Sequence, residues 1–428
     1  MSRWKEVSPW VVTVSRHLPE LSPCQARVLA LWSYAVALTH GAGTSTCAAL
    51  LADLLGCREE SVRQRLREWT WEAKHKRGRA RREVAVAPCF AGLLRWVLAW
   101  WPSEERRLAL ALDATTLGMR FTVLSVSVVY RGCALPVAWA IVGAYQPGSW
   151  QPHWLRLLRA LRGVVPEGWT VLVLADQGVY ARWLFREIQA MGPGWHPYLR
   201  ITGCGLFRLL VDGQLQGASR PLRSVVAPGE RWTGAVECFT GPARRLRCTL
   251  LACWEPRHRS GWLVLTDLAP EQAQLAWYGL RGWIEQGFKD LKRGGWGWHH
   301  TKMTDPARAE RLWLVLAVAT LWAVSVGAAA EANAEAGGDA EEANACSASG
   351  FEALPPTHVA RRSRRREDPA PRRLSVFRRG QITVLVAALR GHRPPLGFFP
   401  RSLWPGERAA RPGVGPGRPP HITHNTYP

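Results

Sequence analysis

The sequence predicts an α/β protein, a mixed sheet flanked by helices, with an N-terminal helical domain and an antiparallel β insertion. Three observations carry this prediction. Residues 1–105 have apolar residues at helical spacing. From about residue 107, strand-like apolar runs alternate with helical segments. Residues 203–268 alternate apolar and polar side chains and are rich in Gly, Pro and Arg, which is typical of antiparallel strands and turns.

The N-terminal region contains a segment with the pattern of a helix-turn-helix. In residues 47–69 a leucine-rich stretch is followed by Gly56 and then by an arginine-rich stretch. The basic run at 74–82 follows and could track a phosphate backbone. We therefore predict a DNA-binding domain over residues 1–105. A small helical bundle with a solvated basic face is the alternative.

The core begins with three apolar runs that read as consecutive strands joined by short turns. The predicted elements are, in chain order, strands at 108–116, 121–132 and 134–142, a helix at 153–162, a strand at 169–176, a helix at 179–191 and a strand at 196–202. Strand-strand-strand-helix-strand-helix-strand is the order of the ribonuclease-H-like fold. We assign residues 106–202 to the first part of such a core.

The remaining segments follow from changes in composition. The insertion (203–268) ends in a strand at 261–268, and residues 269–327 form the second part of the core. Leu312 to Ala330 is uncharged, and we predict a buried core helix rather than a membrane span. An acidic low-complexity linker and a basic stretch occupy 328–372, and a short helix (383–391) and a Pro/Gly-rich tail occupy 373–428.

Charge and cysteine usage restrict the classes of partner. Among 428 residues, 56 Lys and Arg against 33 Asp and Glu give a net charge of +23, which favours a polyanion partner. Nucleic acid is the first candidate and an anionic membrane the second. The ten cysteines form no CxxC pair or Cys/His cluster, so we expect free thiols in a reducing cytoplasm and no zinc site. The N-terminal residues lack the apolar run of a signal peptide, so we do not expect one.

Four residues in the segment 276–293 form the most informative local pattern. If this segment is one helix, Tyr278, Arg281, Glu285 and Lys292 fall within about 60° of one face. An acid flanked by cations and a phenol suits a site that cuts phosphodiesters, because the carboxylate can hold a hard metal beside cations that meet the phosphate. An ordinary solvated charged face is the alternative.

Two aspartates supply partners for this glutamate. Asp113 and Asp176 each end a buried apolar strand, and the two strands are predicted to be neighbours in the sheet. Caps and turns often place a single Asp there, but two of them with Glu285 make a cluster of carboxylates that needs a cation. Two Mg²⁺ ions would satisfy the cluster and support phosphoryl transfer.

These motifs resemble the DDE transposases of bacterial insertion sequences that carry a Y-x2-R-x3-E-x6-K signature. Tyr278, Arg281, Glu285 and Lys292 match every spacing, and ALDATT (111–116) and LADQG (174–178) resemble the two aspartate motifs. The long separation of Asp176 from Glu285 resembles the subclass with a β insertion in the core.

The resemblance implies a role for each matching residue. Asp113, Asp176 and Glu285 would be the catalytic, metal-binding triad for two Mg²⁺ ions, with Mn²⁺ as a substitute. DNA contacts would come from Tyr278, Arg281 and Lys292. Trp262 matches a position where relatives stack a flipped base, although it could instead be a packing residue. Gln177 departs from the family, whose members often carry Arg there.

The run at 293–311 interleaves aromatic and basic residues, among them Trp296, Trp298, Lys302 and Arg308. This composition suits a DNA groove, so Lys302 and Arg308 complete the predicted DNA-binding set.

The predicted function is cut-and-paste transposition by a cytoplasmic, nucleoid-associated homodimer that acts on double-stranded DNA at element ends and target. We expect no membrane partner and no small-molecule substrate. Three alternatives stay open: a nuclease or resolvase on the same fold, a non-catalytic helix-turn-helix DNA-binding protein, and a protein of anionic membranes.

Overall fold

A computed structural model describes residues 4–76, 82–239, 241, 245–256, 260–341 and 374–407. Most of the predicted basic run at 74–82, most of the predicted linker at 328–372 and the end of the tail lie outside the described residues.

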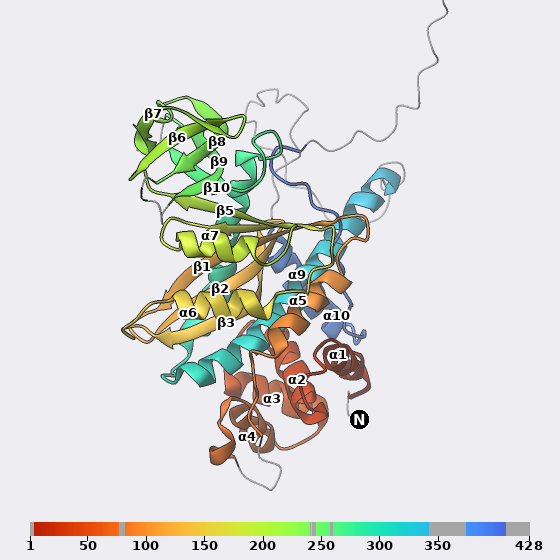
Figure 1. Cartoon of the computed structure of the whole chain (residues 1–428). Helices are drawn as coiled ribbons and strands as arrows, with labels where there is room; N and C mark the ends of the chain where they lie inside the picture. The colour runs from red at the N-terminus through yellow and green to blue at the C-terminus, as the bar shows by residue number, and fades with distance from the viewer. Residues whose placement is uncertain are drawn as a thin grey trace, which may run out of the picture.

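Ten strands form one mixed sheet in the order β3-β2-β1-β4-β5-β10-β9-β8-β6-β7 (Figure 1). The strands are β1 (Arg107–Leu117), β2 (Phe121–Tyr130), β3 (Cys133–Gly143), β4 (Thr170–Ala175), β5 (Trp195–Ile201), β6 (Leu206–Val211), β7 (Gln214–Pro221), β8 (Arg231–Cys238), β9 (Leu246–Cys253) and β10 (Trp262–Thr266).

The first five strands and the two helices between them follow the predicted order. β2 pairs antiparallel with β1 and β3, whereas β1, β4 and β5 run parallel to one another. Every residue of β2 is buried, which explains the nearly continuous apolar run. This arrangement is compatible with a ribonuclease-H-like transposase core.

The strands of the predicted insertion extend the same sheet. β10 pairs antiparallel with β5 through Leu263 and Ile201, and with β9 on its other side. The four strands β6 to β9 therefore continue the sheet beyond β10, at the end of the molecule away from the N-terminal helices (Figure 1).

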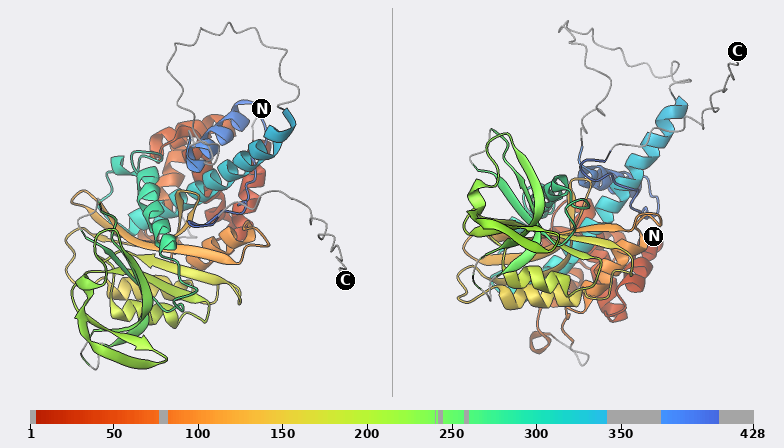
Figure 2. Two further views of the ribbon diagram at one scale, coloured as in Figure 1. Left: turned by 90° about the horizontal axis from the view of Figure 1, so that it is seen from above. Right: turned by 45° about the horizontal axis from the view of Figure 1, so that its top comes forward.

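The described residues contain ten α-helices and several short 3-10 helices. The α-helices are α1 (Trp4–His17), α2 (Pro23–Thr39), α3 (Thr44–Leu55), α4 (Glu59–Thr70), α5 (Cys89–Ala99), α6 (Gln151–Ala160), α7 (Arg182–Gln189), α8 (Trp283–Leu291), α9 (Pro306–Glu341) and α10 (Val376–Leu389). Helices α1 to α4, the N-terminal helical unit, gather with α10 at one end of the sheet (Figure 2).

The predicted helix-turn-helix corresponds to α3, a turn at Gly56 and α4. Gly56 has φ 63°, a left-handed conformation that glycine adopts without a steric penalty. Of the arginines on α4, Arg63 is paired with Glu59 and Glu60, whereas Arg65 and Arg67 point to solvent.

The central helix α9 confirms the predicted core helix. It is long and apolar enough to cross a membrane, but its apolar window is completely buried inside the protein. It packs against α2, α10 and β3, so one hydrophobic core joins the N-terminal helical unit to the sheet.

Two predictions about the C-terminal third were wrong. The linker does not begin at residue 328, because α9 continues to Glu341 through an Ala- and Glu-rich sequence that favours helix. The short helix predicted at 383–391 begins earlier, at Val376, behind the Ser375 cap. Helices α9 and α10 cross at Gly327 and Gly380, where a Cβ on either would collide with the backbone of the other helix.

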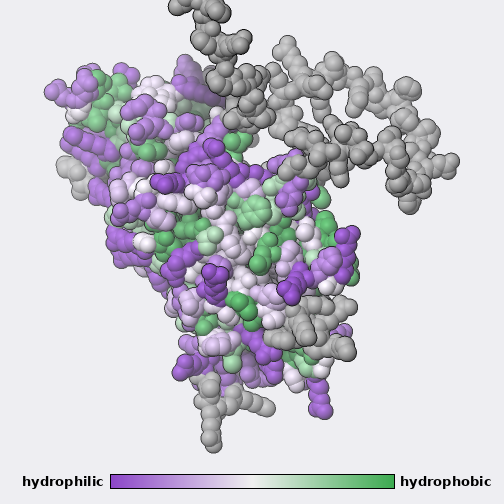
Figure 3. Space-filling model, turned by 90° about the vertical axis from the view of Figure 1, so that its right-hand side faces the viewer, coloured by the Kyte–Doolittle hydropathy of each residue, from purple (hydrophilic) through white to green (hydrophobic). Residues whose placement is uncertain are grey.

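The described part of the Pro/Gly-rich tail, residues 391–407, lies against the core. The Phe399 amide donates to the Trp100 carbonyl at 2.8 Å, and the Tyr130 hydroxyl donates to the Pro400 carbonyl at 2.7 Å. We call residues 391–407 the C-terminal strap. Large hydrophobic side chains remain exposed on α10 and on the strap, such as Leu389 and Leu396. The face in Figure 3 carries separate hydrophobic patches across its middle.

Candidate active site

Strand register brings the two predicted aspartates together. In the parallel pairing of β1 with β4, Leu112 lies opposite Ala175. Asp113 follows Leu112 and Asp176 follows Ala175, so both carboxylates lie at the same edge of the parallel pair. Asp113 does not end its strand as predicted, because β1 continues to Leu117 along its antiparallel partner β2.

The segment that carries the signature is two helices and not one. A 3-10 helix, η4 (Leu275–Gly282), contains Tyr278 and Arg281, and Glu285 lies in the first turn of α8. Gly279 and Gly282 weaken a regular α-helix here, which favours the tighter 3-10 turn. Lys292 lies just past the end of α8. The single helical face predicted from the sequence was therefore wrong, although all four side chains still turn toward β1 and β4.

Arg281 lies among the three acids. Its Nη2 is 2.9 Å from Asp113 Oδ2 and 3.7 Å from Asp176 Oδ2, and its Nη1 is 2.8 Å from Glu285 Oε1. The side chains of Arg281 and Asp113 are only 15 % and 18 % exposed, whereas that of Glu285 is 57 % exposed. One guanidinium thus bridges three carboxylates from three separate parts of the core and offsets only part of their negative charge.

The environment shifts the pKa values of Asp113 and Arg281. Burial raises the pKa of Asp113 above its ordinary value, against the opposing effects of the Arg281 charge and of a hydrogen bond from the Ala114 amide. Burial also lowers the pKa of Arg281, but the surrounding carboxylates outweigh it, so the net pKa is raised and Arg281 stays charged. Arg281 Nε is buried and has no hydrogen-bond partner.

The donor chemistry of the cluster fits a hard divalent cation, since carboxylate oxygens are the ligands that Mg²⁺ prefers. In the present arrangement, no group of three His, Cys, Asp or Glu side chains among the described residues is close enough to hold a metal ion. The Arg281 guanidinium lies where the acids converge. Acceptance of a metal therefore requires the arginine to move aside.

Tyr278 and Lys292 lie on either side of the acids. The Tyr278 hydroxyl is 3.3 Å from Asp176 Oδ1, and burial raises the pKa of this phenol. Lys292 Nζ donates to Thr115 Oγ1 and to the Thr116 carbonyl, each at 2.7 Å, and burial lowers its pKa. Lys292 lines a cavity of about 590 Å³ together with Asp113 and Glu285.

Sequence reasoning missed Arg200. This residue follows Leu199, which pairs with Ala175 in the parallel β4–β5 register, so it lies beside Asp176. Arg200 Nη1 is 3.4 Å from Asp176 Oδ1, and Arg200 Nε is buried without a hydrogen-bond partner. Arg200 also lines a cavity of about 460 Å³ with Gln177. A charged residue near the end of the apolar strand at 196–202 was the available signal.

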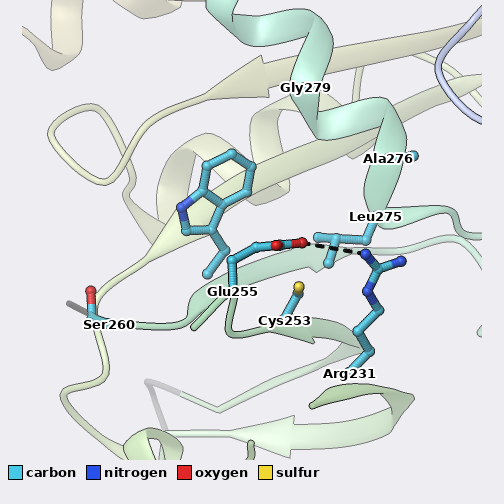
Figure 4. A pocket seen from close by; sticks show the side chains of 8 residues that line it. Arg231, Cys253, Glu255, Ser260, Leu275, Ala276 and Gly279 are labelled. Carbon is cyan, nitrogen blue, oxygen red and sulfur yellow. Dashed lines mark hydrogen bonds and ion pairs between the residues drawn. The ribbon is translucent and has the colours of Figure 1, made fainter. Parts of the chain in front are cut away.

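Trp262 opens β10 next to the signature segment. Its ring meets the Tyr278 ring edge-on at 5.5 Å, and the Arg200 guanidinium lies 5.6 Å from its centre. Trp262 also lines a pocket of about 310 Å³ between the strands β8 and β9 and η4. Figure 4 shows this pocket, with Leu275, Ala276 and Gly279 on one side and the ion pair of Arg231 with Glu255 on the other.

The remaining predicted DNA-binding residues lie apart from the acids. Lys302 and Arg308 line a groove beside α4. The prediction that Trp296 and Trp298 face a DNA groove was wrong, because both are fully buried. Trp296 donates to Thr320 on α9, and Trp298 packs on Trp313.

The mixed sheet thus brings three acids together beside an arginine, a lysine and a tyrosine. The family model of the transposase DDE domain matches residues 106–322. This match covers half of the chain, and the protein belongs to the DDE transposase family. No curated protein matches the sequence.

Proposed function

We propose that this protein is a cut-and-paste transposase of the bacterial insertion-sequence class with the Y-x2-R-x3-E-x6-K signature. It would cleave DNA at the element ends and transfer them into target DNA. The observation that carries the proposal is the convergence of Asp113, Asp176 and Glu285 on one guanidinium.

The three acids would form the metal-binding triad, with two Mg²⁺ ions as the preferred occupants and Mn²⁺ as a substitute. When bound, such ions activate a water or a 3′-hydroxyl and stabilise the leaving oxygen. Besides its contacts with the carboxylates, Arg281 would also bind DNA in this proposal. Once displaced from the carboxylates, its guanidinium would donate hydrogen bonds to the DNA phosphate next to the scissile bond.

The neighbouring residues would hold the strand. Tyr278, which now donates to Asp176, would donate to a phosphate there, and Lys292 would contact the DNA backbone beside Asp113. Arg200 would supply the cation that relatives often carry at the position of Gln177. Trp262, with its small pocket and flanking arginine, would stack a flipped base.

We also propose a role for the regions outside the core. Residues 1–105 would be a DNA-binding domain with its helix-turn-helix in α3 and α4, and residues 203–268 the β insertion that carries the base-stacking residue. The exposed Ile382, Val386 and Leu389 on α10 would contribute to a homodimer that brings two element ends together. The site of action would be the bacterial cytoplasm.

The test uses the purified full-length protein with labelled duplexes that carry the element ends, taken from the DNA that flanks the coding sequence. With Mg²⁺ we expect cleaved ends and strand-transfer products. Asp113→Asn, Asp176→Asn and Glu285→Gln should each abolish both products and leave end binding intact.

Cleavage without joined product would refute transposition and indicate a nuclease or resolvase activity instead. Near-normal cutting by any one of the three variants would show that the triad is wrongly assigned. Arg159→Gln, on an exposed ion pair with Glu187, is the matched control and should cleave normally.

A further inference from the structure

A groove of about 750 Å³ lies between the N-terminal helical unit and the core. One wall is the end of α4 with the short helix η1 (Ala73–His75), and the other is the loop 301–305 with the first turn of α9. Its charged or titratable lining residues are Arg67, Glu72, His75, Lys302, Asp305 and Arg308.

The cations of this groove are available to a ligand. Arg67 and Lys302 are exposed. Over the part of the chain that the structure describes, the side chains of Arg67, Lys302 and Arg308 form no ion pair or hydrogen bond. Arg308 Nε is buried and lacks a hydrogen-bond partner. A buried, unpaired donor costs free energy unless an acceptor reaches it.

The two acids of the groove are already engaged. Glu72 pairs with Lys74, which is not part of the lining, at 2.7 Å. Asp305 Oδ1 accepts a hydrogen bond from the Arg308 amide at 2.8 Å and so caps the start of α9. What the groove offers is therefore mainly hydrogen-bond donors and positive charge, and its ligand should be an anion.

A direct structural link joins the groove to the acid cluster. Arg120, in the turn between β1 and β2, donates to the carbonyls of Thr301 and Met303 in the groove wall. The last residues of β1 before this turn include Thr115 and Thr116, which accept hydrogen bonds from Lys292 beside the acids. The groove is thus fixed relative to the candidate active site on one side and borders α4 on the other.

We propose that this groove binds the phosphate backbone of duplex DNA at a distance from the cleaved bond, with one phosphate contact each from Arg67, Lys302 and Arg308. The inference rests on the proposed DNA-processing function and adds to it a second site, between α4 and α9, that the core and the N-terminal helical unit build together. His75 and Trp71 line the same groove and complete its walls.

The experiment measures binding of the full chain to a mixed-sequence duplex of about 30 base pairs, by fluorescence anisotropy, between about 50 and 200 mM salt. The variants are Arg67→Gln, Lys302→Gln and Arg308→Gln, singly and together. Each single change should reduce the slope of log affinity against log salt by about one, and the triple change by about three. The control Arg159→Gln removes an exposed cation on α6 and should keep the wild-type slope.

Three results would overturn the inference in different ways. If wild type binds the duplex and the triple variant, still folded by circular dichroism, keeps the same slope, the groove does not contact DNA while the proposed function stands. If wild type binds no duplex at all, both proposals are wrong. Equal loss of binding to polyglutamate and to DNA would show a general polyanion site and also refute a duplex-specific groove.

Discussion

Replacing Arg281 by methionine would leave the three carboxylates of the candidate active site without their shared cation. At an effective dielectric constant of about 20, one charge pair at 3 Å is worth about 5 kcal/mol before desolvation is subtracted. Removing one partner of a fully buried pair costs about 3–5 kcal/mol. Glu285 is mostly exposed and contributes little. Since Asp113 and Asp176 are only partly buried, we expect a loss of about 2–3 kcal/mol in the free energy of unfolding.

Divalent cations should restore much of this loss. In the wild-type protein the Arg281 guanidinium already lies between the acids, so a metal ion must displace it. In Arg281→Met the carboxylates lose this shared competitor and only Asp176 keeps a cation, Arg200, so the metal should bind more tightly. A ligand present at a hundredfold excess over its dissociation constant stabilises the folded state by about 2.7 kcal/mol, which is close to the expected loss.

The assay is urea unfolding at pH 8, in EDTA and in a series of Mg²⁺ concentrations, followed by tryptophan fluorescence. Arg281→Met should be less stable than wild type in EDTA and should gain more from Mg²⁺. Arg159→Met, which breaks the exposed pair with Glu187, is the control and should change little in either condition. If Mg²⁺ stabilises wild type and Arg281→Met equally, Arg281 does not compete with metal for the acids.

Further predictions concern protonation, DNA contact and packing. Burial raises the pKa of Asp290 to about 6 from its ordinary 3.8. The folded state therefore binds the Asp290 proton more tightly than the unfolded state does. The free energy of unfolding should fall by up to about 3 kcal/mol as the pH rises from 4 to 6. Urea unfolding across this range should show a flatter profile for Asp290→Asn, and an unchanged profile would contradict it. Lys292→Ala should weaken binding to a cleaved DNA end and reduce its salt slope by about one in anisotropy titrations; an unchanged slope would remove Lys292 from the DNA contacts. Gly380→Ala should destabilise the protein by about 1–3 kcal/mol in thermal unfolding, because its Cβ would overlap the α9 backbone. A variant as stable as wild type would mean that α9 and α10 are less closely packed.

The order of the core strands was predictable because buried strands require long apolar runs. The runs that became β1 and β4 end near Asp113 and Asp176, and parallel strands place such residues at one edge whatever the details of packing. Glu285 was predicted beside them for another reason, because it lies on a helix that was expected to pack against this sheet. The structure brings the three acids together, although the segment that carries Glu285 is two helices and not one.

The position of Arg281 at the centre of the acids was not predictable in the same way. A guanidinium on a long side chain can reach several partners, and its choice here depends on the 3-10 form of η4. Arg200 comes from a neighbouring strand, so its proximity to Asp176 depends on register between segments far apart in sequence. Trp296 and Trp298 lie among basic residues, and local composition does not reveal that α9 covers them.

The C-terminal strap shows how distant parts of the chain can position the site. Trp404 packs edge-on against Trp277 at 5.4 Å, and Trp277 immediately precedes Tyr278 in η4. On its other side, Trp404 lies under the Arg107 guanidinium, at 4.8 Å, and Arg107 begins the strand that carries Asp113. Arg107 also pairs with Glu407 and Glu105. The strap thus connects the signature segment to the first strand of the core. Because η4 is a 3-10 helix with weaker internal hydrogen bonds than an α-helix, these outside contacts help to hold Tyr278 and Arg281 beside the acids.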